Sequence, residues 1–229
     1  MLQLTRTSFV CTESADSVTA MRRAFDEQHA LRLPQFVHSE LLASIQQTVR
    51  TASFYTRNHD GIAREACMAA NPTLAMLALI MNDPALFDFI HRISGCRSIR
   101  YFGGRVYAFA SGADHYDRWH SDAIDARRVG VSVNLSEHEF SGGIFELRHA
   151  DGDAVQWAAA NTGPGDALLF RISDDLVHRV TPVVGPVSRI AYAGWFQDGP
   201  DLLTVLKNPG FQHDGAANSM QYTDPFART

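Results

Sequence analysis

The second half of the chain is constrained most by a series of short segments in which apolar residues alternate with polar ones. From Arg100 to about residue 197 the pattern has a period of two, and Gly, Pro, Asn and Asp separate the segments. That period is typical of β-strands with one buried face. About seven strands are expected, in SIRYFGGRVYAFASG, RRVGVSVNLS, GGIFELRHADG, DAVQWAA, GDALLFRI, HRVTPVV and SRIAYAGWF. Because no helical pattern lies between them, we expect an antiparallel sandwich or barrel of jelly-roll type.

The first third of the chain has a different pattern, with apolar residues three and four positions apart between Ser17 and about Ser94. This spacing predicts helices in SELLASIQQTVRTASF and in NPTLAMLALIMNDPALFDFIHRISG. Ser39 is expected to cap the first, Asn71 followed by Pro72 to begin the second, and Gly95 to end the last. The predicted fold class is therefore α+β, with helices packed outside the jelly-roll core.

We expect one domain over residues 1–229, because no repeat, low-complexity segment or linker divides the chain. Within it, residues 1–99 are expected to be mainly helical support, residues 100–197 the jelly-roll core, and residues 198–229 a C-terminal tail that is loop from Asn208 onward.

Composition excludes several classes of protein. Hydrophobic residues make up 45% and charged residues 20% of the 229 positions, which is typical of a packed globular protein. The net charge of −5 without a basic block argues against a nucleic-acid partner and against a polybasic membrane contact. The longest apolar stretch, Pro72 to Met81, is too short to span a bilayer, and the N-terminus lacks a secretory signal pattern. Three dispersed cysteines without a C-x-x-C favour a reducing cytoplasm, and the pattern gives no basis for an oligomeric state.

The segment W-H-S-D contains a candidate metal site. Residues two apart on an extended chain point to the same side, so His120 and Asp122 can present a nitrogen and an oxygen to one point. His178, in the expected return strand, is the natural third ligand of a 2-His-1-carboxylate triad, which suits non-haem Fe(II). An isolated H-x-D is more often a surface turn, and the spacing to His178 does not by itself bring that residue to the pair.

Arg189 and one strand face are candidates for binding a ligand. Arg189 lies among residues expected to be buried, and a buried guanidinium requires an anion, either a carboxylate ligand or an acidic residue of the chain. In the strand Val129 to Leu135, the apolar positions alternate with Gly130, Ser132 and Asn134. These small residues would either line a cavity or form a solvated face.

Seven landmarks, taken in order, resemble those of the Fe(II)/2-oxoglutarate-dependent dioxygenases, and within them the prolyl-4-hydroxylase-like branch. They are H120-S-D122, R-R-V-G-V-S-V-N-L-S, S141-G-G-I-F-E-L, G165-D-A-L-L-F, H178-R-V-T-P-V, R189 and W195-F. The resemblance covers roughly residues 100 to 197. It implies a double-stranded β-helix, with His120, Asp122 and His178 as ligands of Fe(II). It also implies Arg189 as the partner of the distal carboxylate of 2-oxoglutarate, with O2 as the second cosubstrate. Related halogenases have a small residue at the Asp122 position, so the carboxylate favours hydroxylation.

The family commonly has a Tyr in a Y-x-x-G setting before the H-x-D, and this chain departs from that pattern because Phe109 stands three residues before Gly112. Tyr107 or Tyr116 could supply the hydroxyl to the cosubstrate, together with Ser132 and Asn134, and each is equally plausible as a core residue. Trp119 and Trp195 would wall the pocket or fill the core. We expect Asp114, His115 and Asp117 to form a solvated loop.

The function implied is hydroxylation of a C–H bond in an amino-acid, peptidyl or small natural-product substrate, with release of succinate and CO2. Two alternatives remain open from the sequence. One is a cupin-like protein that binds a metal and a small carboxylate without turnover, and the other is a zinc-dependent hydrolase that uses the same triad.

Overall fold

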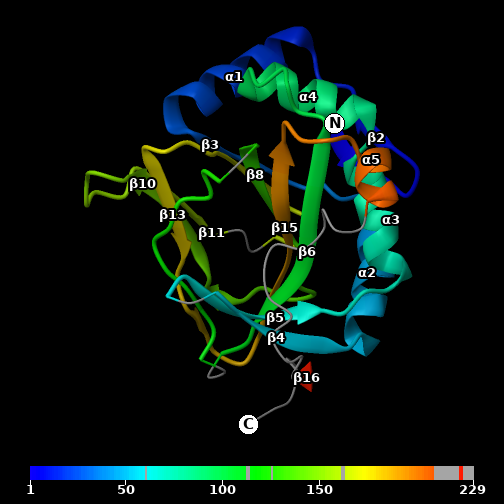
Figure 1. Cartoon of the computed structure of the whole chain (residues 1–229), viewed down its shortest axis with the longest axis vertical. Helices are drawn as coiled ribbons and strands as arrows, with labels where there is room; N and C mark the ends of the chain where they lie inside the picture. Colours follow the sequence, from blue (N-terminus) through cyan, green and yellow to red (C-terminus); the bar gives the residue numbers. More distant parts are fainter. Residues whose placement is uncertain (60, 112–113, 125, 161–162, 209–221, 224–229) are drawn as a thin grey trace.

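The strands expected between residues 100 and 197 form two facing antiparallel sheets (Figure 1). The computed structural model describes residues 1–59, 61–111, 114–124, 126–160, 163–208 and 222–223. All seven expected segments contain a strand: β6 (Tyr101–Phe109), β8 (Arg127–Asn134), β10 (Ile144–His149), β11 (Trp157–Ala160), β12 (Ala167–Arg171), β13 (Leu176–Val180) and β15 (Arg189–Gln197). Short strands β7 (Tyr116–Asp117), β9 (Ser141–Gly142) and β14 (Val183–Val184) complete this part.

The larger sheet has the strand order β16 (Tyr222–Thr223), β4 (Phe54–His59), β5 (Ala63–Met68), β6, β15, β8, β12 and β3 (Ala30–Leu33), with β7 paired to β5. The smaller sheet has the order β11-β10-β13. Successive side chains along each strand of the larger sheet point alternately to an inner and an outer face. Tyr107 of β6, Ala191 of β15 and Leu168 of β12 belong to the same buried cluster as Phe145 and Leu147 of β10. The inner faces of the two sheets therefore pack on each other, and the curled arrangement is a jelly roll, as expected.

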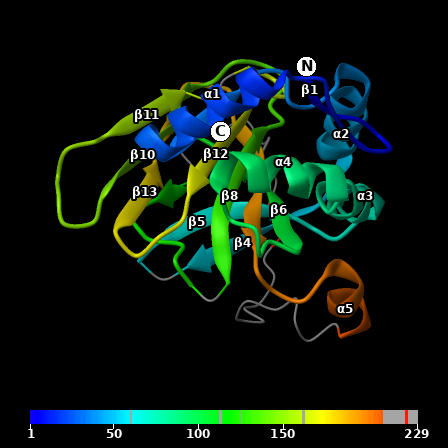
Figure 2. The same ribbon diagram turned by 90° about the horizontal axis from the view of Figure 1, so that it is seen from above.

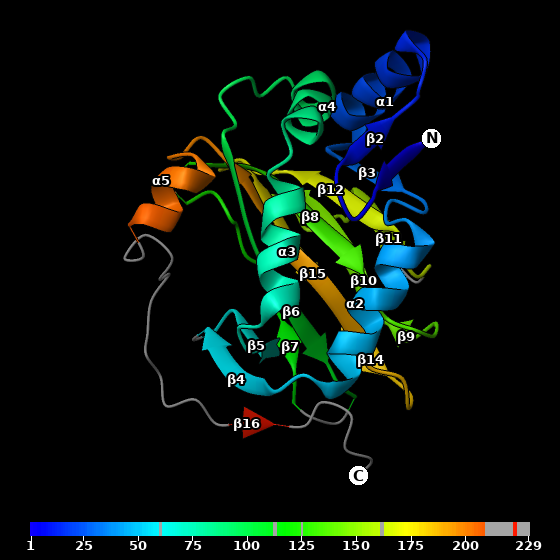
Figure 3. The same cartoon turned by 90° about the vertical axis from the view of Figure 1, so that its right-hand side faces the viewer.

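The outer face of the larger sheet carries the helices (Figure 3). Helices α2 (Ser39–Thr51) and α3 (Pro72–Met81) lie across it, and α1 (Ala15–Gln28) and α4 (Pro84–Ser94) lie side by side at one end (Figures 1 and 2). Leu41 and Ile45 of α2 pack with Val131 and Val133 of β8 in one core cluster. Burial of such side chains stabilises the fold by about 1.5–3 kcal/mol each.

The helix boundaries follow the capping signals with one exception. The side chain of Asn71 accepts hydrogen bonds at the start of α3, and Gly95 ends α4 in the left-handed conformation, as predicted. The long apolar block is two helices, since Pro84 begins the second and cannot continue the first. His38, and not Ser39, caps α2, and Ser39 is the first helical residue.

The region expected to be mainly helical also contains strands. Strands β1 (Leu2–Leu4) and β2 (Phe9–Cys11) form a hairpin, and β3 (Ala30–Leu33), β4 (Phe54–His59) and β5 (Ala63–Met68) extend the larger sheet. Residues 1–99 thus supply part of the sheet as well as its helical cover. Strands β4 and β5 were hidden in the sequence because polar side chains such as Arg57 and Glu65 line a cavity, so the alternation of apolar residues is lost.

The tail contains helix α5 (Leu202–Lys207), which Asp201 caps, and strand β16 (Tyr222–Thr223), which pairs with β4. Of the loop expected after Asn208, the structure describes only Asn208 and β16, so that expectation was wrong for residues 222–223 and the remainder lies outside the described residues. Within the described ranges, no single helix is long and apolar enough to cross a membrane; α3 and α4 pass that test only as a pair bent by 55°.

Strand β15 lies too close to β6 at Gly194 to leave room for a side chain. A Cβ atom there would overlap the carbonyl oxygen of Gly103 and the Cα of Gly104. We predict that Gly194→Ala destabilises the protein by about 2 kcal/mol or more, since backbone must move, and lowers Tm by roughly 4–8 °C. Gly152→Ala, where a Cβ meets nothing within 4 Å, is the control. Equal melting temperatures for the two variants in thermal denaturation would contradict this prediction.

Candidate active site and metal centre

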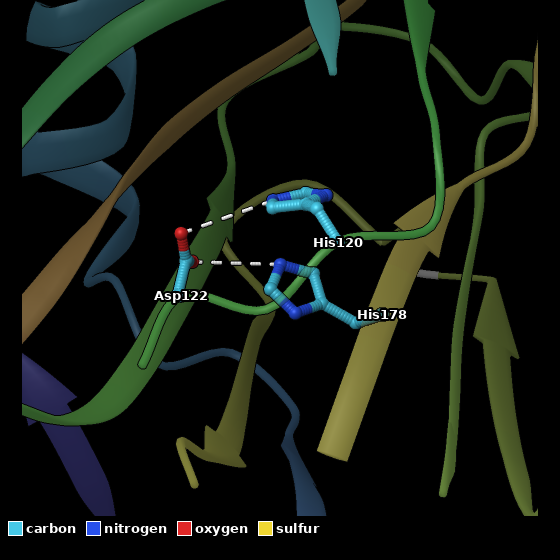
Figure 4. A group of neighbouring side chains, drawn as sticks. All are labelled: His120, Asp122 and His178. Carbon is cyan, nitrogen blue, oxygen red and sulfur yellow. Dashed lines mark ion pairs between the residues drawn. The ribbon is translucent and has the colours of Figure 1, made fainter. Parts of the chain in front are cut away.

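His120, Asp122 and His178 converge at one end of the space between the two sheets (Figure 4). One potential ligand atom from each lies within 4.8 Å of the others, and this is the one such group found among the described residues. Nε2 of His120 lies 3.8 Å from Oδ1 of Asp122, and Nε2 of His178 lies 3.5 Å from Oδ2. The structure therefore brings together the three residues that the sequence suggested as metal ligands.

Backbone pairing sets the distance between the two histidines. The N–H of His120 donates to the carbonyl of His178 at 3.0 Å, and the N–H of His178 donates to the carbonyl of His120 at 2.9 Å. This bridge attaches the segment after β7 to β13, so that both imidazoles extend to the same side with ring centroids 4.3 Å apart. Asp122 follows two residues after His120 and returns its carboxylate to the same point.

The protonation states of these side chains suit metal binding. Burial lowers the pKa of His178 to about 4, so its Nε2 carries a free lone pair at neutral pH. Burial alone would raise the pKa of Asp122, but the nearby His178 and His120 and the hydrogen bond from Trp195 hold it below its usual range. Nδ1 of His120 lies 2.7 Å from the carbonyl of Arg118, which favours the tautomer with Nε2 as the ligand atom.

Trp195 of β15 orients the carboxylate of the triad. Its Nε1–H donates to Oδ2 of Asp122 at 2.6 Å, and its ring lies under the guanidinium of Arg127 at 3.6 Å. Because the indole occupies one position at Oδ2, the carboxylate is held in a single orientation. Trp195 thus contacts the triad directly and does more than fill the core.

Trp119, the neighbour of His120, lies on the opposite, outer face of the smaller sheet. Its ring lies between two guanidinium groups, that of Arg148 in β10 at 4.6 Å and that of Arg179 in β13 at 4.7 Å. Cation–π contacts of this kind are worth about 0.5–1 kcal/mol at exposed sites. Trp119 therefore attaches the segment that carries His120 to β13, which carries His178, and to the neighbouring strand β10. It does not line the cavity.

The triad opens into a cavity of about 310 Å³ between the sheets. Arg189 lies in its wall, with 2% of its surface exposed, and donates to the hydroxyl of Tyr107 at 2.8 Å and to Oγ of Ser132 at 3.0 Å. Arg189, Tyr107 and Ser132 therefore lie together in the same cavity as the triad, as the sequence suggested. Ser132 faces the cavity, so the small polar face of β8 is not a solvated surface.

Two other residues suggested for the cosubstrate site lie elsewhere. Asn134 is buried on the same strand face, but it does not line the cavity, and its Oδ1 accepts from the backbone N–H of Ser136. Tyr116 lies in β7, under the guanidinium of Arg118 at 4.8 Å, and it does not line the cavity either. Of the two tyrosines, Tyr107 is the one in contact with Arg189.

Residues 102–197 match the family model of the 2OG-Fe(II) oxygenase superfamily. This range holds the triad, the cavity-lining strands β6, β8 and β15, and Arg189. The segment belongs to the 2OG-Fe(II) oxygenase superfamily. No curated protein matches the full sequence significantly.

Several solved structures have a similar fold. A prolyl-4-hydroxylase of Pseudomonas putida superposes with a TM-score of 0.59 at 17% identity and covers 80% of this chain and 100% of its own. A 2OG-Fe(II) oxygenase family oxidoreductase of Burkholderia pseudomallei gives 0.60 at 16% identity, covering 84% and 95%. A prolyl hydroxylase of Trichoplax adhaerens, in complex with a hypoxia inducible factor peptide fragment, gives 0.57 at 17%, covering 82% and 94%. At these identities the likeness establishes the shared fold.

The donor set of this oxygenase segment fits the Fe(II) of its family. Two imidazoles and one carboxylate make a 2-His-1-carboxylate set, which is the donor pattern of non-haem Fe(II) oxygenases. The carboxylate at position 122 is present and points into the triad. A chloride-binding site of the halogenase type, which needs a small residue there, is therefore not formed.

Several charged residues of the cavity were not recognised from the sequence. Asp117 was expected in a solvated loop, and that expectation was wrong: it lines the cavity, its Oδ1 lies 3.3 Å from Nδ1 of His120, and burial raises its pKa to about 7. Asp114 is exposed, as expected. Glu65 of β5 and Arg105 of β6 also line the cavity. Of Glu65 and Arg105, only Arg105 could have been suggested by the sequence, because it is an arginine at an inward position of a predicted strand.

Trp195→Phe separates the hydrogen bond to Asp122 from the aromatic contact with Arg127. We predict that this variant binds metal about 10- to 100-fold more weakly than the wild type, because the carboxylate loses the group that orients it. Anaerobic titration with Fe(II), or with Co(II) as a visible probe, measures the affinity. Trp157→Phe is the matched control, since Trp157 packs against the buried cluster and does not line the cavity. Unchanged metal affinity in Trp195→Phe would show that the hydrogen bond does not support the site.

Proposed function

We propose that this chain is a hydroxylase that holds Fe(II) with His120, Asp122 and His178 and binds 2-oxoglutarate through Arg189, Tyr107 and Ser132. Membership of the 2OG-Fe(II) oxygenase superfamily supports the enzyme class, with Fe(II), 2-oxoglutarate and O2 as its cofactor and cosubstrates. The assignment of individual residues rests on the geometry of the cavity.

Arg189 is the observation that carries the proposal. It is almost fully buried, and its side chain donates to the neutral hydroxyl groups of Tyr107 and Ser132 at 2.8 and 3.0 Å. Within the described ranges no carboxylate lies within 4 Å of it, so the internal salt bridge considered as an alternative is not found there. A buried guanidinium without a counterion is unfavourable, and a dicarboxylate that enters the cavity would supply one.

The remaining side chains divide the work of binding and orientation. Tyr107 and Ser132 hold the guanidinium of Arg189 in place, so that its remaining N–H groups can meet a carboxylate in a fixed direction. Phe145 and Phe170 pack on the ring of His178 and shield that face of the site from water. When bound, Fe(II), 2-oxoglutarate and O2 would supply the oxidising chemistry: one oxygen atom of O2 would enter succinate as CO2 is released, and the other would hydroxylate a C–H bond of the substrate.

The substrate is proposed to be an amino-acid, peptidyl or small natural-product molecule. The cavity volume suits a small molecule or one side chain of a peptide. We also propose a location in the cytoplasm, supported by the three free cysteines Cys11, Cys67 and Cys96.

An anaerobic absorption titration tests the cofactor assignment. We expect a weak visible charge-transfer band that requires both Fe(II) and 2-oxoglutarate. His178→Ala should abolish the band. Arg189→Ala should keep it but need about 10- to 100-fold more 2-oxoglutarate, since a charge-assisted hydrogen bond contributes about 1.5–3 kcal/mol.

Arg50→Ala is the matched control, because Arg50 is exposed and pairs with Glu137 on the outer side of α2. A wild-type protein that binds Fe(II) but shows no band with 2-oxoglutarate would contradict the proposed function. Such a result would favour metal binding without dioxygenase chemistry.

A further inference from the structure

A second group of charged side chains, on β4, β5 and β6, lines the same cavity. Glu65 of β5 is buried, with 3% of its surface exposed, and two guanidinium groups approach its Oε1. Nε of Arg105 donates to Oε1 at 2.6 Å, and Nη1 of Arg57 lies 3.5 Å from the same oxygen. One carboxylate therefore faces two cations at the wall of the cavity, and this group lies outside the residues proposed to hold iron and 2-oxoglutarate.

Glu65 engages Arg105 from the side and leaves the outer end of its guanidinium available. Among the described residues, Nη1 and Nη2 of Arg105 have no hydrogen-bond partner, although 27% of its side-chain surface is exposed in the cavity wall. The guanidinium lies over the rings of Tyr107 and Trp195, at 5.6 and 5.5 Å from their centroids. These contacts fix its plane, and they use neither of the terminal nitrogens.

The two arginines also keep Glu65 ionised. Burial on its own would raise the pKa of Glu65, but Arg105 and Arg57 outweigh burial and hold it below the usual range. Glu65 is therefore a carboxylate at neutral pH, and the group of Arg57, Glu65 and Arg105 carries a net charge of +1, since two cations face one anion. An anion entering the cavity compensates this charge.

We propose that the substrate carries a carboxylate and that the terminal nitrogens of Arg105 bind it. This inference rests on the proposed function, because it assumes that 2-oxoglutarate occupies the Arg189 end of the cavity. A carboxylate matches the two parallel N–H groups of an arginine terminus, and the charge-assisted pair fixes direction as well as affinity.

The placement of the two arginines supports different roles for them. Arg189 and Arg105 lie over the ring of Tyr107 at 5.3 and 5.6 Å, one buried and one partly exposed to the cavity. Trp195 lies under Arg105 and donates to the metal ligand Asp122. The indole of Trp195 therefore lies between Arg105 and the triad. A small molecule whose carboxylate binds Arg105 would extend past this ring toward the metal ligands.

Two probes of nearly the same shape test the inference: 4-fluorobenzoate, which carries a carboxylate, and 4-fluorobenzamide, which carries a neutral amide. Binding is measured by fluorine NMR under anaerobic conditions, on full-length protein loaded with Fe(II) and saturating 2-oxoglutarate. We expect the wild type to bind the benzoate at least about tenfold more tightly than the benzamide. Line broadening by Fe(II), compared with the Zn(II)-loaded protein, is expected for the benzoate because it lies near the metal.

Variants of the ion pair give opposite expected results. Arg105→Gln should remove the preference for the benzoate, whereas Glu65→Gln should strengthen benzoate binding several-fold, because the competing carboxylate is lost. If Arg105→Gln fails to fold with Glu65 left unpaired, Glu65→Gln/Arg105→Gln replaces it and should also show no preference. Arg50→Gln, on the surface, is the matched control and should bind both probes as the wild type does.

Several results would overturn the inference. These are no binding of the benzoate, equal binding of the two probes by the wild type, or weaker benzoate binding in both Arg105→Gln and Glu65→Gln. A loss of 2-oxoglutarate affinity in Arg105→Gln as large as that in Arg189→Ala would assign Arg105 to the cosubstrate site instead. The charge-transfer band separates the two proposals: an intact band without probe binding overturns only this inference, and a missing band overturns the proposed function.

Discussion

The active site depends on two backbone hydrogen bonds between His120 and His178. They join a segment that follows β7 to a strand of the smaller sheet, at the end of the space between the sheets. Because the pairing fixes the separation of the two Cα atoms, both imidazoles reach one point without help from long or flexible side chains. Asp122 then needs only the two-residue period of an extended chain to complete the triad.

The two faces of the larger sheet have separate physical roles. Its outer face packs against α2 and α3 with aliphatic side chains, and this layer supplies much of the burial that stabilises the fold. Its inner face carries Arg105, Tyr107, Ser132 and Arg189, which are costly to bury without partners. The apolar packing on the outer face offsets the cost of burying charged groups on the inner face. Ligands of opposite charge would complete the interactions of those groups.

The sequence was informative where local periodicity decides structure. The alternation after Arg100 predicted the seven strands, and the order of His120, Asp122, His178 and Arg189 predicted residues that the fold brings to one cavity. Strands β4 and β5 escaped recognition because their inward side chains are polar, which removes the apolar alternation. The burial of Asp117 and the contact of Trp195 with Asp122 depend on pairing between distant strands, which a single sequence does not specify.

A glycine on β8 leaves room for the aromatic rings that pack on His178. A Cβ atom at Gly130 would overlap the ring of Phe170, which lies 4.6 Å from the ring of His178 and 4.8 Å from that of Phe145. Phe145 in turn stacks on His178 with the planes 20° apart. The missing side chain on the larger sheet therefore leaves room for an aromatic pair that fixes a metal ligand on the smaller one. The glycine between Val129 and Val131 thus has a role in the site, although it makes no contact with the metal ligands itself.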